Sequence, residues 1–249
     1  MYTDFHSLAD DYFLNITLQT TLPLPTGRET ILQFCEAVQR EFPEMTAFFR
    51  REGGEYVLES DHDQGAYKWL ELQPHRLVAG HFNPPAPADA YHLHEWLLER
   101  SVYFLGVSGL DIDSLDVMFG FNLDYAGNRD ELVAKALLSG SPLGVLAAEG
   151  PAMSIEFEPN LVLSMEPECY LQARLAIETH SSSYQVRTGH YENEPISVYF
   201  TVRQYPKAGK VIQLGESFKR QSHLCEELVT KLILPNVLQP ISAAISSSG

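Results

Sequence analysis

The first strong pattern in the sequence is an alternation of apolar and polar residues over residues 12–20. Tyr12, Leu14, Ile16 and Leu18 share one phase, and most residues between them are polar. A period of two predicts a strand with one buried face. A helix is then predicted over residues 28–42, where apolar residues recur at helical spacing and Pro43 ends the run. Four strand-like runs follow, at residues 45–51, 55–59, 66–72 and 76–82, before a second helix beyond residue 87.

The second half of the chain repeats this order of elements. A strand with alternating apolar residues is predicted around residues 117–123, and a helix over about 128–138 ends at the Gly140–Pro142 turn. Four strand-like runs then follow at residues 153–158, 161–165, 170–179 and 196–204, and a long helix over about 216–234 is predicted to end before Pro235. Residues 242–249 are rich in Ser and Ala, so we expect them to fray.

The two halves also share local sequence at equivalent places. Residues 28–32 (RETIL) align with 129–133 (RDELV), and residues 92–98 (HLHEWLL) align with 223–229 (HLCEELV). Because both matches fall in register with the same element order, we predict an internal duplication into units 1–107 and 108–249. The boundary is short and partly apolar, so we expect one pseudo-symmetric α+β unit with a continuous antiparallel sheet and helices packed on one face.

A duplicated β-α-β-β-β-β-α unit resembles the saddle of the TATA-binding-protein-like fold. The alternative is a double hotdog, in which each sheet wraps a long helix. Both resemblances rest on element order over most of the chain, without a signature motif, so neither transfers an activity to particular residues.

The charge of the chain argues against nucleic acid, the partner that a saddle-shaped fold suggests. The chain has 33 Asp and Glu against 17 Lys and Arg, a net charge of −16, which divides into 7 − 16 = −9 for residues 1–107 and 10 − 17 = −7 for residues 108–249. Binding to nucleic acid draws on clustered Lys and Arg, so we expect no nucleic-acid partner. The sequence shows no apolar run typical of a membrane span and no targeting pattern at residues 1–6, which favours a cytoplasmic protein.

Metal and disulfide chemistry find little support in the sequence. Cys35, Cys169 and Cys225 are far apart and odd in number, which predicts buried free thiols. His92 and Glu95 lie three residues apart on one predicted helix, and the aligned residues 223 and 226 repeat the pair, but a metal ion needs further ligands that neither helix supplies. We therefore interpret both pairs as exposed helical His–Glu pairs and expect no metal or cofactor.

Motifs for catalysis are also missing. The sequence contains neither a G-x-S-x-G nucleophile elbow nor a glycine-rich phosphate loop. The double-hotdog alternative would place a carboxylate near the start of a central helix, where Glu29 and Asp130 lie. Acidic residues in the first turn of a helix are also favoured by the helix dipole without any function. These two residues are the candidate catalytic groups of the alternative, an acyl-thioester hydrolase or lipid-binding protein.

Aromatic residues in the predicted strands give the main functional hypothesis. Half of them should face the core, and the rest would line a groove if the other sheet face is open. We predict a non-enzymatic binding or scaffold protein, monomeric or homodimeric, that uses this face or a sheet edge to bind proteins, itself or small apolar ligands. The candidate binding residues are Tyr67, Trp69, Phe119, Phe121 and Tyr199.

Overall fold

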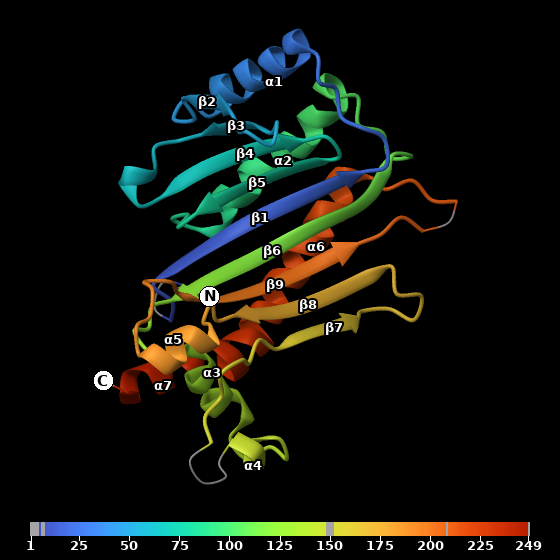
Figure 1. Cartoon of the computed structure of the whole chain (residues 1–249). Coiled ribbons are helices and arrows are strands. Elements are labelled where there is room, and N and C mark those ends of the chain that lie inside the picture. The colour runs from blue at the N-terminus through green and yellow to red at the C-terminus, as the bar shows by residue number, and fades with distance from the viewer. Residues whose placement is uncertain (1–4, 6–7, 148–151, 208, 249) are drawn as a thin grey trace.

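Nine antiparallel strands form a single sheet, and the helices pack around it in an α+β arrangement (Figure 1). The structure is a computed structural model that describes residues 5, 8–147, 152–207 and 209–248. Most of the N-terminal segment inspected for a targeting signal, and the last residue of the tail expected to fray, lie outside the described residues.

The first half of the chain follows the predicted order. Strand β1 is Asp11–Thr20, and its buried positions alternate along the whole strand, as the sequence predicts. The remaining elements are helix α1 (Arg28–Glu41), strands β2 (Ala47–Arg50) and β3 (Tyr56–Glu59), a 3₁₀ turn η2 (His62–Gln64), strands β4 (Tyr67–Gln73) and β5 (Arg76–Phe82), and helix α2 (Pro87–Phe104).

Among the residues that the structure describes, the second half has one strand fewer than the first. Its elements are β6 (Ile112–Leu123), α3 (Arg129–Leu138), α4 (Gly144–Ala147), β7 (Asn160–Ser164), β8 (Leu171–Glu178), α5 (Ser183–Thr188), β9 (Ile196–Gln204), α6 (Leu214–Leu228), the π-helical segment η3 (Val229–Leu238) and α7 (Gln239–Ser248).

The strand predicted at residues 153–158 does not form. The N–H groups of Ser154 and Phe157 donate to the carboxylates of Glu131 and Asp130, and Asn128 Nδ2 donates to the Ser154 carbonyl at 2.8 Å. Backbone groups of a strand must be paired with another strand or with other acceptors. Side chains at the start of α3 satisfy them here, so this segment stays irregular.

The last helix runs well past the predicted stop at Pro235. It continues through η3 and α7 to Ser248, so residues 242–248 are helical where the sequence predicts a frayed tail. A proline ring clashes with the carbonyl four residues earlier in an α-helix, and the wider π-helical turns relieve that clash. Leu238 and Ile241 are fully buried and anchor the extension.

By length and composition alone, the continuous helix Leu214–Ser248 would be able to cross a membrane. Core helices of soluble proteins meet the same two criteria. Phe218, Cys225 and Val229 of this helix are buried, and the Cys225 thiol lies 3.7 Å from the Val117 carbonyl oxygen in β6. The helix is therefore weak evidence for a membrane span and is compatible with a soluble protein, and the cytoplasmic location stays a prediction.

The sheet order is β2-β3-β4-β5-β1-β6-β9-β8-β7, with β1 and β6 paired at its centre. Tyr12 lies opposite Phe121, and Leu14 lies opposite Phe119, so that the buried positions of both strands share one face. Helices α2 and α6 contact the central strands on this face, and they lie behind the sheet in Figure 1. The opposite face carries no packed helix over its central strands in this view, and we call it the open face.

Two of the three cysteines follow the prediction. Cys35 in α1 and Cys225 in α6 are buried free thiols, but Cys169 is exposed. Cys169 lies in the turn between β7 and β8 with a positive φ of 62°, a conformation found in turns at the surface. Its expected burial is therefore wrong.

Candidate functional site

A row of aromatic side chains crosses the open face from β4 to β9. Tyr67, Phe82, Phe13 and Tyr199 follow one another on strands β4, β5, β1 and β9, and all four are half-buried. Ring centroids are 5.0 Å apart for Tyr67–Phe82 and 5.8 Å apart for Phe82–Phe13, with the rings stacked. Phe13 and Tyr199 meet edge to face at 6.2 Å. We call these four residues the aromatic row.

Two glycines on this face leave room for large aromatic side chains from neighbouring strands. Gly120 in β6 separates Phe13 from Tyr199, and a Cβ at Gly120 would lie 2.2 Å from carbons of the Phe13 ring. Gly80 in β5 is covered in the same way, because a Cβ there would lie 2.5 Å from the indole nitrogen of Trp69. The absent side chains therefore allow aromatic groups of neighbouring strands to lie flat on the sheet.

The five predicted binding residues divide between the two faces. Tyr67, Trp69 and Tyr199 lie on the open face, as the functional hypothesis requires. Phe119 and Phe121 face the helices, are completely buried and pack on Phe5 with centroids 5.6 and 5.9 Å away. We correct the set accordingly, because these two rings form part of the core and not of the open face.

Phe13 and Phe82 complete the row, and the sequence reasoning missed both. Phe13 falls between Tyr12 and Leu14, in the phase that is otherwise polar. A large aromatic residue in the polar phase of an amphipathic strand was the available signal, since that phase points away from the core.

Acidic side chains border the aromatic row. Glu59 and Asp11 lie near Tyr67, while Glu178 lies near Tyr199. Burial, together with these carboxylates, raises the pKa of both tyrosine hydroxyls. The hydroxyls therefore stay protonated near neutral pH and can donate hydrogen bonds to a ligand.

Neutral or weakly basic groups are the partners of these acids. Glu59 lies 3.3 Å from His62, Asp11 accepts a hydrogen bond of 2.6 Å from Asn83, and Glu178 lies 3.8 Å from His180. By contrast, two arginines of the same face are already neutralised, because Arg203 pairs with Asp116 and Arg51 pairs with Glu71. Arg174 of β8 is exposed on the same face beside Tyr199 and Glu178, and its Nε donates to Asn160 Oδ1 at 3.1 Å. With three acids against this one arginine, the border of the aromatic row is negative on balance.

A cavity of about 270 Å³ adjoins the row on β6, β8 and β9. Tyr199 and Met118 line it together with the small residues Ala176 and Thr201, and Arg174 and Glu178 add one positive and one negative side chain. Ligand sites for whole small molecules begin at about 300 Å³. The cavity is thus suited to one large side chain of a partner.

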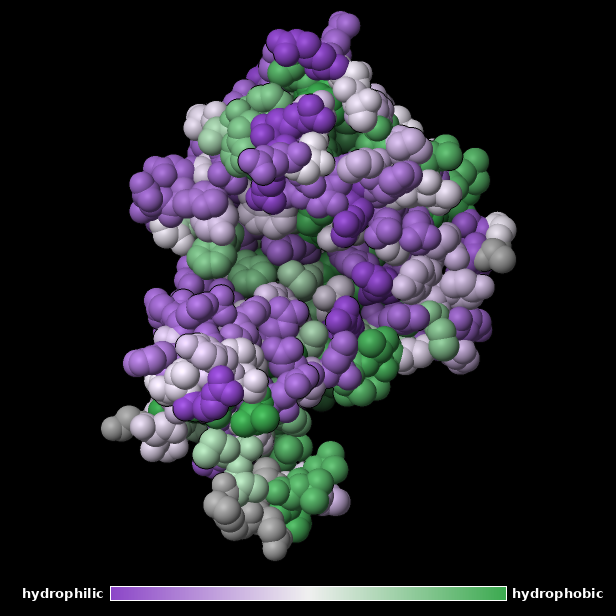
Figure 2. Space-filling model, viewed as in Figure 1, coloured by the Kyte–Doolittle hydropathy of each residue, from purple (hydrophilic) through white to green (hydrophobic). Residues whose placement is uncertain are grey.

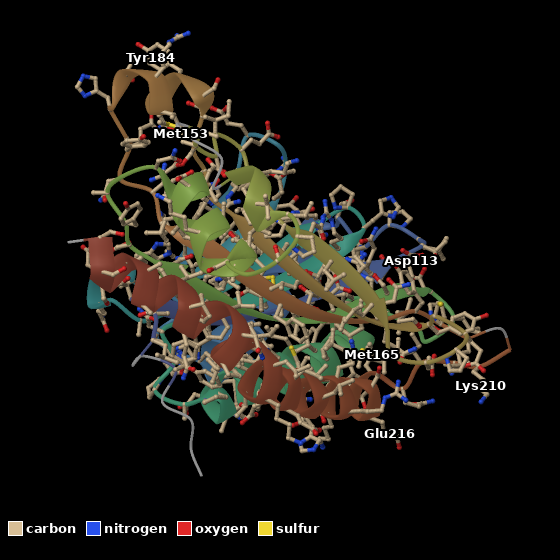
Figure 3. All side chains as sticks on the ribbon, turned by 90° about the horizontal axis from the view of Figure 1, so that it is seen from below. Asp113, Met153, Met165, Tyr184, Lys210 and Glu216 are labelled. Atoms are coloured by element: carbon tan, nitrogen blue, oxygen red, sulfur yellow. The ribbon has the colours of Figure 1, made fainter. Side chains whose placement is uncertain are left out.

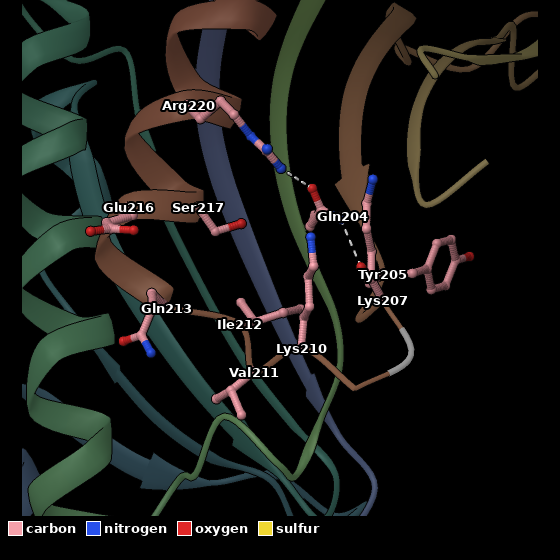
Figure 4. Close-up of a pocket in the computed structure, with 10 residues that line it drawn as sticks. All are labelled: Gln204, Tyr205, Lys207, Lys210, Val211, Ile212, Gln213, Glu216, Ser217 and Arg220. Carbon is pink, nitrogen blue, oxygen red and sulfur yellow. Dashed lines mark hydrogen bonds between the residues drawn. The ribbon is translucent and has the colours of Figure 1, made fainter. Parts of the chain in front are cut away.

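A second cavity, of about 350 Å³, lies where the loop after β9 meets the start of α6 (Figure 4). Lys207 Nζ lies 2.7 Å from Glu166, and the Arg220 guanidinium donates to Gln204 Oε1. Gln204 in turn donates to the Tyr205 carbonyl at 2.7 Å. The Arg220–Gln204 bond thus ties α6 to the end of β9, and the Lys207–Glu166 pair ties the loop to the turn after β7. Figure 3 shows Lys210 and Glu216 of this cavity at the end of the molecule away from Met153.

The candidate catalytic carboxylates lie apart. Glu29 is exposed in the first turn of α1, where it accepts a hydrogen bond from Gln33. Asp130 is buried and accepts hydrogen bonds from the Phe157 N–H at 2.6 Å and the Thr179 hydroxyl at 2.8 Å. Neither residue lines the two cavities above or a third one, of about 470 Å³, between α3 and α4.

The expected His–Glu pairs of the two long helices are not made. Glu95 of α2 instead bonds to Lys219 of α6 at 2.6 Å, and Glu226 of α6 accepts from the Tyr91 hydroxyl of α2 at 2.8 Å. Both acids therefore tie one helix to the other. Within the described ranges, no group of three or more His, Cys, Asp or Glu residues is placed to hold a metal ion.

The sequence matches no protein-family model and no curated protein.

Proposed function

We propose that this protein is a non-enzymatic binding protein that uses the open face of its sheet to bind a protein partner. The partner would supply a segment in which apolar side chains alternate with Lys or Arg. The observation that carries the proposal is the aromatic row, which is only half-buried although it lies across the centre of the sheet.

The chemistry of the row supports protein binding. Tyrosine and other aromatic side chains dominate the binding energy of protein interfaces, since they bury a large area and lose little side-chain entropy. The neighbouring cavity, next to Tyr199, is suited to one further side chain from the partner. Figure 2 shows this side of the molecule, where hydrophobic side chains lie between hydrophilic ones.

Charge favours a basic segment over an acidic one. Asp11, Glu59 and Glu178 border the row and have no strong cationic partner. The whole chain carries −16, which attracts basic partners over long distances at low salt. The same charge argues against nucleic acid, so we retain the proposal of no nucleic-acid partner.

We further propose that the fold is a duplicated saddle of the TATA-binding-protein-like kind. The strand order supports this, because it reads as mirrored about the central pair β1 and β6, apart from the missing outer strand. Equivalent positions of the aligned helices also behave alike. His94 and Cys225 are both fully buried, and Glu95 and Glu226 both bond to the other helix.

The alternative, an acyl-thioester hydrolase, has weaker support. It requires a tunnel that ends at Glu29 or Asp130. Glu29 is exposed, and one carboxylate oxygen of Asp130 is already bonded to Phe157 and Thr179. We therefore propose a binding function without catalysis.

The two tryptophans offer a direct test. Trp69 lies on the open face, whereas Trp96 lies in α2 and packs against Phe42, so a Trp96→Phe variant reports on the open face alone. We expect its fluorescence to shift when a synthetic peptide of alternating Lys and Leu is added, and to stay unchanged with the matching Glu–Leu peptide. Adding Tyr199→Ala should weaken binding at least tenfold, because a central aromatic anchor is worth about 2 kcal/mol.

Tyr103→Ala is the matched control, because Tyr103 is an exposed aromatic residue of α2 on the helix side. Equal binding of the Lys and Glu peptides would contradict the proposal. So would a Tyr199→Ala variant that binds as tightly as the control.

A further inference from the structure

Strand β7 forms one edge of the sheet and is exposed to solvent. All five of its residues are exposed, with exposed fractions of 52% for Leu161, 54% for Val162 and 49% for Leu163. Figure 1 shows no strand beyond it, and Figure 2 shows hydrophobic side chains gathered in this region and over α4. An exposed apolar edge strand is a ready template for pairing with another strand.

The backbone of β7 offers a defined set of free groups. Its ladder to β8 includes the Met165 N–H bonded to the Leu171 carbonyl at 2.8 Å and the Ile177 N–H bonded to the Pro159 carbonyl at 3.1 Å. Bonded pairs alternate in an antiparallel ladder. Residues 161 and 163 therefore turn their backbone groups toward β8, and Asn160, Val162 and Ser164 turn theirs outward.

Charged residues, prolines or bulges usually protect an edge strand from pairing with another chain, and β7 has none of them. Residues 160–164 contain no charge and no proline, and their register with β8 has no bulge. At the other edge of the sheet, β2 has only four residues and ends in Arg50, followed by Arg51. Within the described part of the second half, no strand takes the place of β2, because residues 153–158 are bound to α3 instead.

We propose that β7 is a dimerisation edge, at which two copies of this chain pair antiparallel about a two-fold axis at Val162 and join their sheets into one. The sequence of the strand, Asn-Leu-Val-Leu-Ser, has the same pattern of polar and apolar residues in both directions. Its outward-facing residues 160, 162 and 164 are also symmetric about Val162. An isologous pair needs this symmetry, and a foreign strand does not.

In this pairing, Asn160 lies opposite the partner's Ser164 and Val162 lies opposite the partner's Val162. Leu161 then meets the partner's Leu163 on the face that carries the helices, so the exposed aliphatic side chains cover one another. The nearest like charges are Glu158 and the partner's Glu166, beyond the strand ends. Within one chain, Glu158 already accepts from the Thr179 N–H at 2.9 Å, and Glu166 is paired with Lys207.

The mass of the protein in solution tests the proposal. Light scattering at micromolar concentration should give twice the chain mass of 28.0 kDa. The dimer should become more stable as salt is added, because salt screens the repulsion between two copies of charge −16. A wild-type protein that has the mass of one chain at every salt concentration overturns the proposal, even if it captures a foreign strand at this edge.

A proline at position 162 tests the pairing of two copies without disturbing the fold of each. Val162→Pro removes an outward N–H and leaves the ladder to β8 intact, so it should give the mass of one chain with an unchanged circular dichroism spectrum. Val162→Thr keeps the N–H and should remain dimeric, as should Phe48→Pro, which removes an outward N–H at the opposite edge. A dimeric Val162→Pro protein overturns the proposal.

Cross-linking tests the register. In a Cys169→Ser background, Val162→Cys should form a disulfide-linked dimer on mild oxidation, since directly opposed residues lie about 5.5 Å apart between Cα atoms. Leu163→Cys should not, because its own counterpart is displaced along the strand. Equal cross-linking of both variants contradicts the register. The peptide test of the open face can be repeated in Val162→Pro, which keeps the two proposals separable.

Discussion

The ring of Phe13 in β1 lies flat over Gly120 in the neighbouring strand β6. A Cβ at Gly120 would lie 2.2 Å from two carbons of that ring, far inside contact distance. The two residues are directly paired in the ladder at the centre of the sheet. The missing side chain therefore places the Phe13 ring within reach of Tyr199 on the far side of β6.

Gly120→Ala should consequently displace Phe13 and break its contact with Tyr199. We expect a loss of about 1–3 kcal/mol in the free energy of unfolding, as for other overpacked sites, measured by urea denaturation. Adding Phe13→Ala should make Gly120→Ala nearly neutral. Gly215→Ala is the control, since a Cβ there meets nothing within 4 Å. A Gly120→Ala variant as stable as this control would rule out the tight contact.

Local pattern was enough to predict most strands and helices. The alternation in β1 and β9 and the helical spacing in α1 and α3 survive folding, because each element buries one face on the same core. The single antiparallel sheet is confirmed, whereas the duplication and the saddle stay proposals.

The errors occurred where distant side chains decide the local structure. Residues 153–158 have a strand-like sequence, but Asp130 and Glu131, more than twenty residues earlier, bind their backbone. In the candidate site, Phe119 and Phe121 were grouped with Tyr199 as strand aromatics. Both belong to the apolar phase of β6, together with Val117 and Leu123, and this phase already indicates the core. The pairing of Phe121 with Tyr12 and of Phe119 with Leu14 places them there.

The buried histidines predict a loss of stability in acid. His94 in α2 is completely buried beside Phe218, and neither ring nitrogen has a hydrogen-bond partner within the described structure. Burial lowers the pKa of His94 to about 3, and burial with Lys68 nearby lowers that of His81 in β5 to about 4, although Asp89 and Glu44 oppose the second shift. Both values lie below the unfolded value of 6.5.

The unfolded chain therefore binds more protons than the folded chain, and stability falls as the pH drops from about 6.5 toward these lowered values. Between pH 7.5 and 4.5 we expect His94 to account for a loss of about 2–3 kcal/mol. His94→Leu should remove this part of the pH dependence in urea denaturation curves and should not lower stability at pH 7.5. A His94→Leu protein with the wild-type pH profile would contradict the assignment.

Thiol labelling should distinguish the three cysteines. Cys169 is exposed, whereas Cys35 and Cys225 are buried, and burial raises the pKa of Cys35 to about 12 and also raises that of Cys225. The thiolate is the reactive form. The native protein should thus react with one equivalent of a thiol reagent, and with three after unfolding. Cys169→Ser should abolish the native reaction. Labelling of this variant before unfolding would contradict the burial of the other two.

Arg129 should be a major source of stability. This arginine is wholly buried, and its guanidinium donates to the carbonyls of His180, Glu192 and Glu194 and to the Ser181 hydroxyl. Arg129→Met would remove all four of these charge-assisted hydrogen bonds, so we expect a loss of at least about 3 kcal/mol in the free energy of unfolding. Glu29→Ala, at an exposed site, should change it by less than about 0.5 kcal/mol. Similar effects of the two substitutions would contradict this role.

Helices α2 and α6, one from each half of the chain, help to hold the two halves together. Residues 1–107 and 108–249 meet along the β1–β6 ladder and through the bonds Lys219–Glu95 and Tyr91–Glu226, and none of these contacts depends on the peptide bond between Val107 and Ser108. Each piece made alone would expose a central strand and the apolar side of a helix. The two separately produced fragments should therefore find each other in solution and restore the intact fold without a covalent link.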